Sequence, residues 1–341
     1  MKRRSFRLAA VGAAALAVTT LAGVGAATAV RPTASPSVSP AVSPSAGKSH
    51  HHHHGDRVTI YLTRHGRTIL NQTDTVQGWA DSPLLIGNQQ YATLVNGSVP
   101  SINAGRPLAR TVGANLGKKV GRFDVAYSAD GKRHFETATY MLQGARQKLS
   151  VTQDAGLREV NFGKYEGKEN EEMWTDAVKE LRSTVTNSNY VIDNSNGPRG
   201  CVIPGAGNNP CEAGGWQTMQ GVAIAEHGLY GMMDAIKEVA DAPDLGLPAE
   251  NCTDVNKRMT ASLRAIAQKA AKKHQDTVLV VSSGLSINCF ANNPDMRTVT
   301  GEIPAMPPAG VPNVGVTKVI YKKGGFAIDG EVGSTAYYPK S

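Results

Sequence analysis

The segment VTIYLTRHGRTILN, residues 58–71, carries the pattern from which the rest of the chain can be interpreted. Its first five residues, Val58 to Leu62, are apolar and rich in β-branched side chains, which predicts a buried strand. Arg64, His65 and Gly66 follow at the end of that strand. An arginine offers a planar fork of donors to phosphate oxygens, a glycine lets the backbone approach closely, and a histidine nitrogen can attack phosphorus. The segment therefore predicts a phosphate-handling site at a strand end.

Two further apolar runs, Phe123 to Tyr127 and Val278 to Val281, are also typical of buried strands. Helical patterns lie between the runs, at Leu108 to Leu116, His134 to Gln147 and Val255 to His274. Strands that alternate with helices predict an α/β fold, a three-layer sandwich with a mostly parallel central sheet and helices on both faces. Because ligands bind beyond the carboxyl ends of such strands, Arg133, which follows the second run, is expected near His65.

The last third of the chain adds two smaller predictions. Thr253 or Asp254 can cap the helix that begins near Val255. Val316 to Tyr321 and Gly325 to Ile328 are two short apolar runs separated by a Lys-Lys-Gly turn. They predict a final hairpin or edge strand.

The first 55 residues have an export pattern. Residues 1–29 combine a basic head, an apolar run and the small-x-small end Ala27-Thr28-Ala29, which predicts a removable signal peptide of either the Sec or the twin-arginine type. Residues 30–55 are rich in Pro, Ser and Ala and include a pentahistidine run, His50 to His54. This composition predicts a disordered linker, and the histidines are either an affinity tag or a natural metal-scavenging tract. We expect a secreted or cell-surface protein.

Residues 56–341 are expected to form a single large domain. Two stretches do not fit a minimal α/β plan, Ile86 to Gly105 and a longer Gly- and Asn-rich stretch over about 168–251. We interpret the second as an insertion. Insertions of this length usually lie on the surface and often cover an active site.

Charge and cysteine content limit the function classes. The formal net charge of +8 falls to +4 without the four cations of the signal peptide, which is too small and too scattered to indicate nucleic-acid binding. No membrane span is expected once the signal is removed. Four cysteines in an exported protein predict disulfides, and three pairings are possible. We favour Cys201–Cys211, which closes a short loop, together with Cys252–Cys289.

Four sequence blocks occur in a fixed order: RHGRTILN (64–71), QGWADSPL (77–84), YSADGKRHFETA (127–138) and LREVNFGKYEG (157–167). Together they resemble the histidine phosphatase superfamily, which is also called phosphoglycerate mutase-like. A lone Arg-His-Gly would be weak support, but four ordered blocks that span most of the expected domain are specific.

The resemblance implies a role for each matching residue. His65 would become phosphorylated, and Arg64 and Arg133 would clamp the phosphoryl group. Glu159 would protonate the leaving oxygen and then deprotonate the attacking water. The residues implied to bind substrate are Thr68, Asn71 and Gly284. Glu166 matches a family glutamate that we interpret as structural, and no cofactor or metal is implied.

One position departs from the family pattern. The later strand of the family usually ends in His-Gly, with that histidine donating to the same phosphoryl group, whereas Ser283-Gly284 stands there in this chain. A serine hydroxyl can donate a hydrogen bond but supplies no positive charge. Three other histidines are possible substitutes, and each is disfavoured: His227 precedes the long helix, His274 is expected to face solvent, and His134 adjoins Arg133 but is expected to point elsewhere on its helix, away from the site.

The sequence therefore predicts a secreted phosphatase that hydrolyses phosphomonoesters through a phosphohistidine on His65. The alternative is a catalytically impaired phosphate- or polyanion-binding surface protein of the same fold, because Ser283 replaces a charged donor. A phosphoglycerate-type mutase is disfavoured in an exported chain, and a phytase is disfavoured because the Arg-x-Pro continuation is missing. The expected partner is a small phosphorylated substrate, and nothing in the sequence determines the oligomeric state.

Overall fold

A computed structural model of the chain describes residues 57–87, 105–184, 191–192, 201–202, 227–246, 248–307 and 310–340. The predicted signal peptide, the linker and the histidine run lie outside the described residues. So do most of the stretch from Ile86 to Gly105 and the middle of the predicted insertion.

Within the described residues, a six-stranded sheet forms the centre of the fold, in the spatial order β3-β2-β6-β1-β7-β8. Its strands are β1 (Arg57–Arg64), β2 (Val125–Ser128), β3 (Val151–Gln153), β6 (Thr277–Ser282), β7 (Val316–Lys322) and β8 (Gly325–Ile328). The first four in sequence order run parallel, and β7 and β8 add an antiparallel hairpin at the β1 edge. The predicted strands and the final hairpin are confirmed. A separate two-stranded ladder joins β4 (Val191–Ile192) to β5 (Cys201–Val202).

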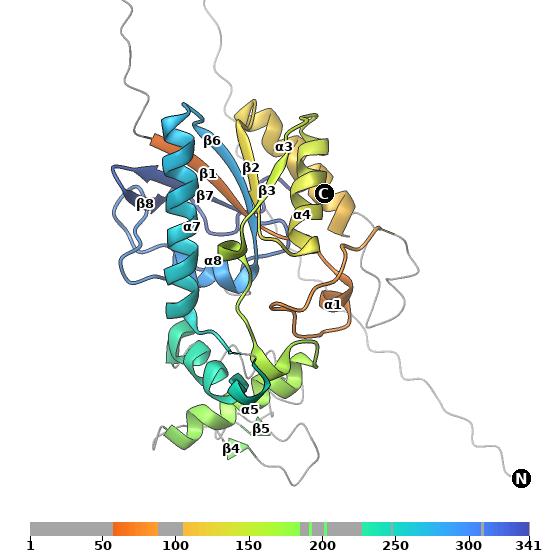
Figure 1. Ribbon diagram of the computed structural model, residues 1–341, viewed down its shortest axis with the longest axis vertical. Helices are drawn as coiled ribbons and strands as arrows, with labels where there is room; N and C mark the ends of the chain where they lie inside the picture. The colour runs from red at the N-terminus through yellow and green to blue at the C-terminus, as the bar shows by residue number, and fades with distance from the viewer. Residues whose placement is uncertain are drawn as a thin grey trace, which may run out of the picture. The chain divides into compact units, whose positions relative to one another are not determined.

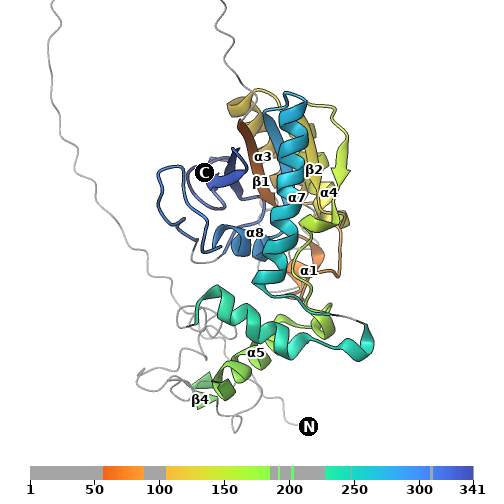
Figure 2. The same cartoon turned by 60° about the vertical axis from the view of Figure 1, so that its left-hand side comes forward.

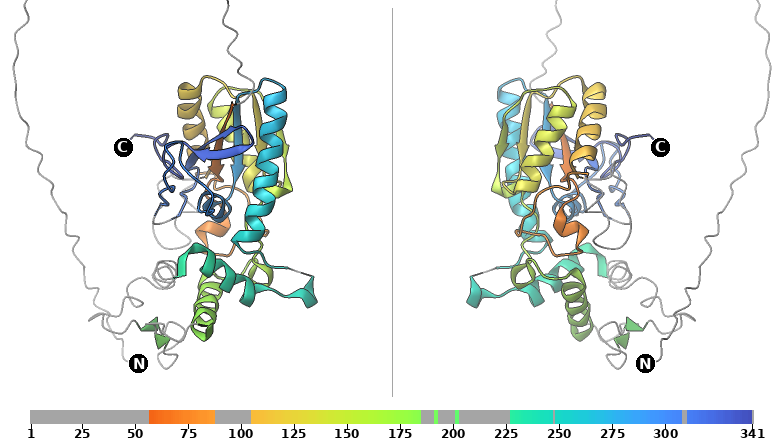
Figure 3. Two further views of the ribbon diagram at one scale, coloured as in Figure 1. Left: turned by 90° about the vertical axis from the view of Figure 1, so that its left-hand side faces the viewer. Right: turned by 90° about the vertical axis from the view of Figure 1, so that its right-hand side faces the viewer.

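Helices cover both faces of the sheet, which confirms the predicted three-layer sandwich (Figures 1 and 3). Side chains alternate along β1: Tyr61 packs with α3 (Gly105–Val120) and α4 (Lys132–Gly144), while Val58, Ile60 and Leu62 pack with the opposite layer. That layer contains α7 (Cys252–Lys272) and α8 (Gly284–Ala291). Such two-sided burial explains why the strand reads as a continuous apolar run.

Helices α3 and α4 lie unusually close together because glycines face the contact. A Cβ on Gly113 would lie 2.1 Å from the carbonyl oxygen of Met141. A Cβ on Gly144 would lie 2.0 Å from the carbonyl oxygen of Arg110. No other residue type fits these positions without a shift of a helix backbone. The packing holds the start of α4, where Arg133 lies, against the sheet.

The start of α7 differs from the prediction. Asn251 is the N-cap, and its side chain accepts from the backbone N–H of Asp254. The Asp254 carboxylate in turn accepts from the backbone N–H of Asn251. Asp254 is therefore the third residue of a capping box and not the cap. Thr253 is not the cap either. The helix begins three residues earlier than its apolar periodicity indicates.

Parts of the predicted insertion form their own apolar cluster beyond the carboxyl ends of β1 and β6 (Figure 2). Helix α5 (Asn170–Thr184) contributes Met173, Trp174 and Val178, and a helix over residues 227–240 contributes Met232 and Ile236. The cluster also includes buried residues of the main domain, among them Val76, Val160, Phe162 and Cys252. The described part of the insertion is therefore packed against the sandwich.

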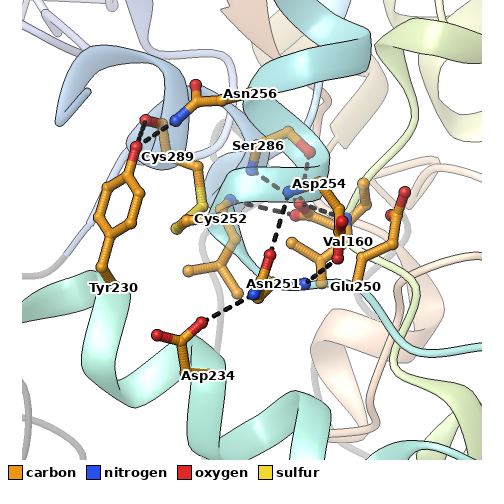
Figure 4. The surroundings of a disulfide bond; sticks show 12 residues. Val160, Tyr230, Asp234, Glu250, Asn251, Cys252, Asp254, Asn256, Ser286 and Cys289 are labelled. Carbon is orange, nitrogen blue, oxygen red and sulfur yellow. Dashed lines mark hydrogen bonds between the residues drawn. A yellow bond between two sulfur atoms is a disulfide. The ribbon is translucent and has the colours of Figure 1, made fainter. Parts of the chain in front are cut away.

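A disulfide between Cys252 and Cys289 joins the start of α7 to α8, as predicted (Figure 4). Tyr230 reaches the same place from helix 227–240, where its hydroxyl donates to the Cys289 carbonyl and accepts from Asn256. Asn251 also donates to Asp234 at 2.8 Å. The disulfide region thus ties the insertion to the two helices behind the sheet. The predicted Cys201–Cys211 pair lies outside the described side chains.

Candidate active site

Three turns meet at the carboxyl edge of the sheet. Strands β1 and β6 end side by side, with Arg64 opposite Ser282, and β2 ends beside β6. After these ends begin α1 (Ile69–Gln72), α8 and α4. Gly66 N–H donates to Thr137 of α4 at 2.9 Å, which fixes the turn after β1 against that helix. The sequence blocks around His65, Arg133 and Ser283 therefore come together as predicted.

His65 is buried, with 2% of its surface exposed, and its ring orientation is fixed by a bond to its own turn. Nδ1 lies 2.8 Å from the Gly66 carbonyl oxygen. A carbonyl can only accept, so Nδ1 carries the proton and Nε2 retains its lone pair. Burial, followed by the positive charges of Arg133 and Arg64, holds the pKa of His65 well below 6.5. The imidazole is consequently neutral near pH 7 and able to act as a nucleophile.

Arg64 lies next to His65 in the chain, and part of its donor set is unused. Its Nη1 donates to the Val311 carbonyl at 2.7 Å, while its buried Nε has no hydrogen-bond partner among the described residues. A Cβ on Gly284 would lie 3.1 Å from that Nε, so Gly284 makes room for the guanidinium. Burial lowers the pKa of Arg64, opposed by the negative charge of Glu159. An oriented, unpaired N–H of a buried cation is suited to an anionic ligand.

Arg133 is the second residue of α4 and is 1% exposed, but most of its donors are already engaged. Nη1 donates to the Ala80 carbonyl and to Asp81 at 2.9 Å each, and Nη2 donates to the Gly78 carbonyl at 2.6 Å. Its buried Nε has no partner among the described residues. The predicted clamp is therefore reduced to one free N–H, together with a positive charge that acts on His65.

Glu166 fixes the loop over residues 78–80, whose carbonyl groups accept hydrogen bonds from Arg133. Its carboxylate accepts backbone N–H bonds from four residues, Gly78, Trp79, Ala80 and Phe162. A Cβ on Gly78 would lie 2.1 Å from the Val160 carbonyl oxygen and 2.2 Å from this carboxylate, so only glycine fits there. The structural role predicted for Glu166 matches these contacts, and the loop places Arg133 relative to the sheet.

Glu159 is 6% exposed and bound at the start of α8. Its Oε1 accepts from the backbone N–H of Ser286 at 2.8 Å and of Val160 at 3.0 Å, and its Oε2 accepts from Leu285 N–H at 3.1 Å. A helix N-terminus favours a carboxylate at this point. The structure thus brings Glu159 near Arg64, as the sequence predicts, and leaves its acid–base role as a prediction.

Thr68 and Asn71 stabilise the turn that follows His65. Thr68 Oγ1 accepts from Asn71 N–H at 3.1 Å, and Asn71 Oδ1 accepts from Thr68 N–H at 3.3 Å, which forms a capping box for α1. Thr68 also donates to Gln77 at 2.6 Å. These contacts explain both residues by the shape of the turn, and their predicted substrate contacts stay a prediction.

The prediction for His134 is wrong. We expected it to point away from the site, yet His134 is 1% exposed and its Nε2 lies 2.6 Å from Ser283 Oγ. Its ring lies edge-on to the His65 ring, with 5.3 Å between centroids. Arg133 and His134 sit in the first turn of α4, whose N-terminal end faces the site, so neighbouring side chains of this turn both reach it. The sequence signal was the position of His134 next to an arginine at a helix start.

The other two histidines agree with their predictions. His274 is exposed at the end of the turn after α7. His227 begins the helix over residues 227–240 within the insertion, which precedes α7 and β6 in the chain. Neither supplies the position held by Ser283.

Comparison with known proteins gives the same answer as the four blocks. The family model of the histidine phosphatase superfamily (branch 1) matches residues 102–192. The 2,3-bisphosphoglycerate-dependent phosphoglycerate mutase of Bartonella bacilliformis is 30% identical over 112 residues, 33% of this chain. Phosphoglycerate mutase from Bacillus anthracis str. Sterne is 29% identical, with a TM-score of 0.59, over 84% of this chain and 97% of that chain. The family-model match, the mutase relative and the fold therefore all place the similarity of this chain with the histidine phosphatase superfamily.

Two features of these matches describe their extent. The chain spans 46% of the length of the Bartonella relative that it matches. A mycobacterial glucosyl-3-phosphoglycerate phosphatase is also similar, at 18% identity and a TM-score of 0.43 over 82% of this chain and the whole of that one. The family-model match and the two mutases support phosphoryl-transfer chemistry in general.

A search of the described residues finds no helix that is both long and apolar enough to cross a membrane.

Proposed function

We propose that the protein is a phosphomonoesterase that works through a phosphohistidine on His65. The observation that carries the proposal is the state of the His65 ring. It is buried and neutral near pH 7, with Nδ1 bound to the Gly66 carbonyl and Nε2 available, between the cations of Arg64 and Arg133. A neutral imidazole beside preorganised positive charge is what attack on a phosphoryl group requires.

The reaction takes two displacements at phosphorus. In the first, His65 Nε2 forms a bond to phosphorus while the ester P–O bond breaks, and protonated Glu159 gives its proton to the leaving oxygen. In the second, a water attacks phosphorus, the P–N bond breaks, and Glu159 takes the water proton back. The free Nε–H groups of Arg64 and Arg133 stabilise the charge on the transferring group, whose negative charge is spread over its oxygens.

A direct assay tests the proposal. Purified protein is incubated with p-nitrophenyl phosphate and with several sugar and inositol phosphates, beside His65→Ala. We expect phosphate release by the wild type only, and an acid-labile phosphoryl label on His65. If the wild type releases no more phosphate than His65→Ala on every substrate, the proposal fails.

A phosphoglycerate mutase is the second candidate, because the Bacillus anthracis mutase matches this chain over nearly all of its own length. The assay that separates the two candidates supplies 3-phosphoglycerate with catalytic 2,3-bisphosphoglycerate. Formation of 2-phosphoglycerate without net phosphate release would favour the mutase. Net phosphate release would favour the phosphatase.

We further propose that the protein acts outside the cytoplasm. The export pattern of residues 1–29 supports this, and so does the Cys252–Cys289 disulfide, since disulfides persist in oxidising compartments. N-terminal sequencing of the native protein from culture supernatant and envelope fractions tests it. A mature chain that begins at Val30 is expected, and an unprocessed chain found only in the cytoplasm would contradict it.

A further inference from the structure

His134 is a buried histidine that the reaction described above does not use. Its ring faces that of His65 at 5.3 Å between centroids, and its Nε2 is bonded to Ser283. The ring belongs to α4, whereas Ser283 stands 149 residues later at the end of β6. Two segments distant in sequence therefore place one imidazole and one hydroxyl at a single point beside the nucleophile.

The surroundings of His134 carry more positive charge and more hydrogen-bond donors than the protein itself neutralises, which favours the binding of an anion. Burial, followed by the charge of Arg133 and the proximity of His65, holds the pKa of His134 well below 6.5. The nearest carboxylates are already engaged, since Asp81 pairs with Arg133 and Glu159 caps α8. Among the residues that the structure describes, the buried Nε–H groups of Arg64 and Arg133 have no hydrogen-bond partner. A phosphoryl dianion would satisfy these donors and supply the missing negative charge.

We propose that the Nε2–H of His134 donates a hydrogen bond to the phosphoryl group carried by His65, while Ser283 Oγ, as a second acceptor of the same N–H, holds the imidazole in place. The His134–Ser283 pair then performs the task that the resemblance assigns to one histidine at position 283. The inference rests on the proposed nucleophilic role of His65. During transfer His134 forms and breaks no covalent bond, because it only stabilises charge on a phosphoryl oxygen.

The packing adds a specific consequence for position 283. Ser283 is fully buried and its Oγ lies 2.6 Å from His134 Nε2, so a histidine cannot enter position 283 while His134 is present. Ser283→His alone is expected to impair the protein. Removal of the His134 ring frees the space, so a double variant, His134→Ala with Ser283→His, moves the imidazole from α4 to the end of β6.

The test measures turnover of p-nitrophenyl phosphate, affinity for inorganic phosphate by calorimetry, and the thermal midpoint of each variant. His134→Ala is expected to lower kcat by about 10²-fold, the usual cost of one lost transition-state donor, and to weaken phosphate binding about tenfold. His134→Gln, which keeps an N–H donor, is expected to retain more activity than His134→Ala. His274→Asn, at an exposed histidine, is the matched control and should equal the wild type.

The double variant decides between a catalytic and a structural role. We expect it to recover kcat to within about tenfold of the wild type, because the donor is restored from the other side. A double variant no better than His134→Ala would overturn the inference, and so would phosphate affinity and kcat unchanged in folded His134→Ala and His134→Gln. If the wild type binds phosphate through His134 but shows no turnover on any substrate, the proposed function fails and the role of His134 in transfer fails with it, whereas turnover that is unchanged in His134→Ala overturns the inference alone. Absence of phosphate binding by the wild type would overturn both.

Discussion

Glu166→Gln should destabilise the fold and slow the proposed reaction, although the contacts of Glu166 are to the loop over residues 78–80 and to Phe162 and not to His65. Its Oε1 accepts from the N–H groups of Trp79 and Phe162 at 2.7 and 2.9 Å, and its Oε2 accepts from Gly78 and Ala80 at 3.1 and 2.6 Å. Glutamine has nearly the same shape but replaces one oxygen with an NH2 group. Whichever way the amide turns, two backbone donors face another donor.

The size of the effect follows from those two lost bonds. A hydrogen bond to a charged group contributes about 1.5–3 kcal/mol, so two of them give a gross loss of about 3–6 kcal/mol. Glu166 is partly exposed, and water can replace part of what is lost. We therefore expect the free energy of unfolding to fall by about 2–4 kcal/mol. Because the same loop supplies the carbonyls that hold Arg133, kcat should fall about tenfold as well.

Urea unfolding followed by tryptophan fluorescence measures the first effect, and phosphate release measures the second. Glu172→Gln is the matched control, because Glu172 pairs only with Lys168 in an exposed i,i+4 contact and should cost at most about 0.5 kcal/mol. If Glu166→Gln lowers the unfolding free energy no more than Glu172→Gln does, the loop is not held by this carboxylate and the reasoning is refuted.

Three further predictions concern the scaffold and the histidines. Replacing both Cys252 and Cys289 with alanine should lower the unfolding free energy by about 3–4 kcal/mol, the entropy expected for a loop of 37 residues, measured against urea with and without reductant. Gly113→Ala should lower the free energy of unfolding by about 1–3 kcal/mol, whereas the same substitution at an uncrowded helical glycine would raise it. A raised thermal midpoint of Gly113→Ala would contradict the close contact with Met141. Because the folded pKa of His65 and of His134 lies well below 6.5, the unfolded chain takes up more protons as pH falls below that value. Stability should therefore decrease there by up to about 2.7 kcal/mol per pH unit, and His65→Asn with His134→Gln should flatten the urea-unfolding profile between pH 7.5 and 5.

The parts of the fold that the sequence predicts are those with a local pattern. Strands β1 and β6 are apolar runs buried on both faces, and α7 shows a single apolar face over 21 residues. Helix α8 was missed because its eight residues are mostly apolar and buried, so no polar face marks a helical period. Strand β3 was missed because it has three residues, two of them exposed. Short elements are defined by the packing of the rest.

The candidate site divides in the same way. Arg64 and His65 lie at the end of β1, Arg133 lies in the first turn of α4 after β2, and Glu159 lies in the segment that follows β3, so the topology of the sheet brings them to one edge. The sequence does not indicate which N–H groups of the arginines bond to the protein and which remain available to a ligand. Arg133 was expected to clamp a phosphoryl group with its whole fork, but the carbonyls of Gly78 and Ala80 and the Asp81 carboxylate occupy its terminal nitrogens. Those contacts depend on a loop about 55 residues earlier, whose path is set by Glu166.

The error over His134 has a physical cause that extends to other departures from a family pattern. Successive residues of a helix point about 100° apart, so a neighbour of Arg133 in mid-helix would indeed face elsewhere. At the first turn the target lies beyond the end of the helix, and directions that diverge around the axis can still reach it. When a strand-end residue such as Ser283 departs from the expected type, the first turn of each helix that begins at the same sheet edge is therefore the place to search for its replacement. Among the first turns of α1, α4 and α8, His134 is the one imidazole.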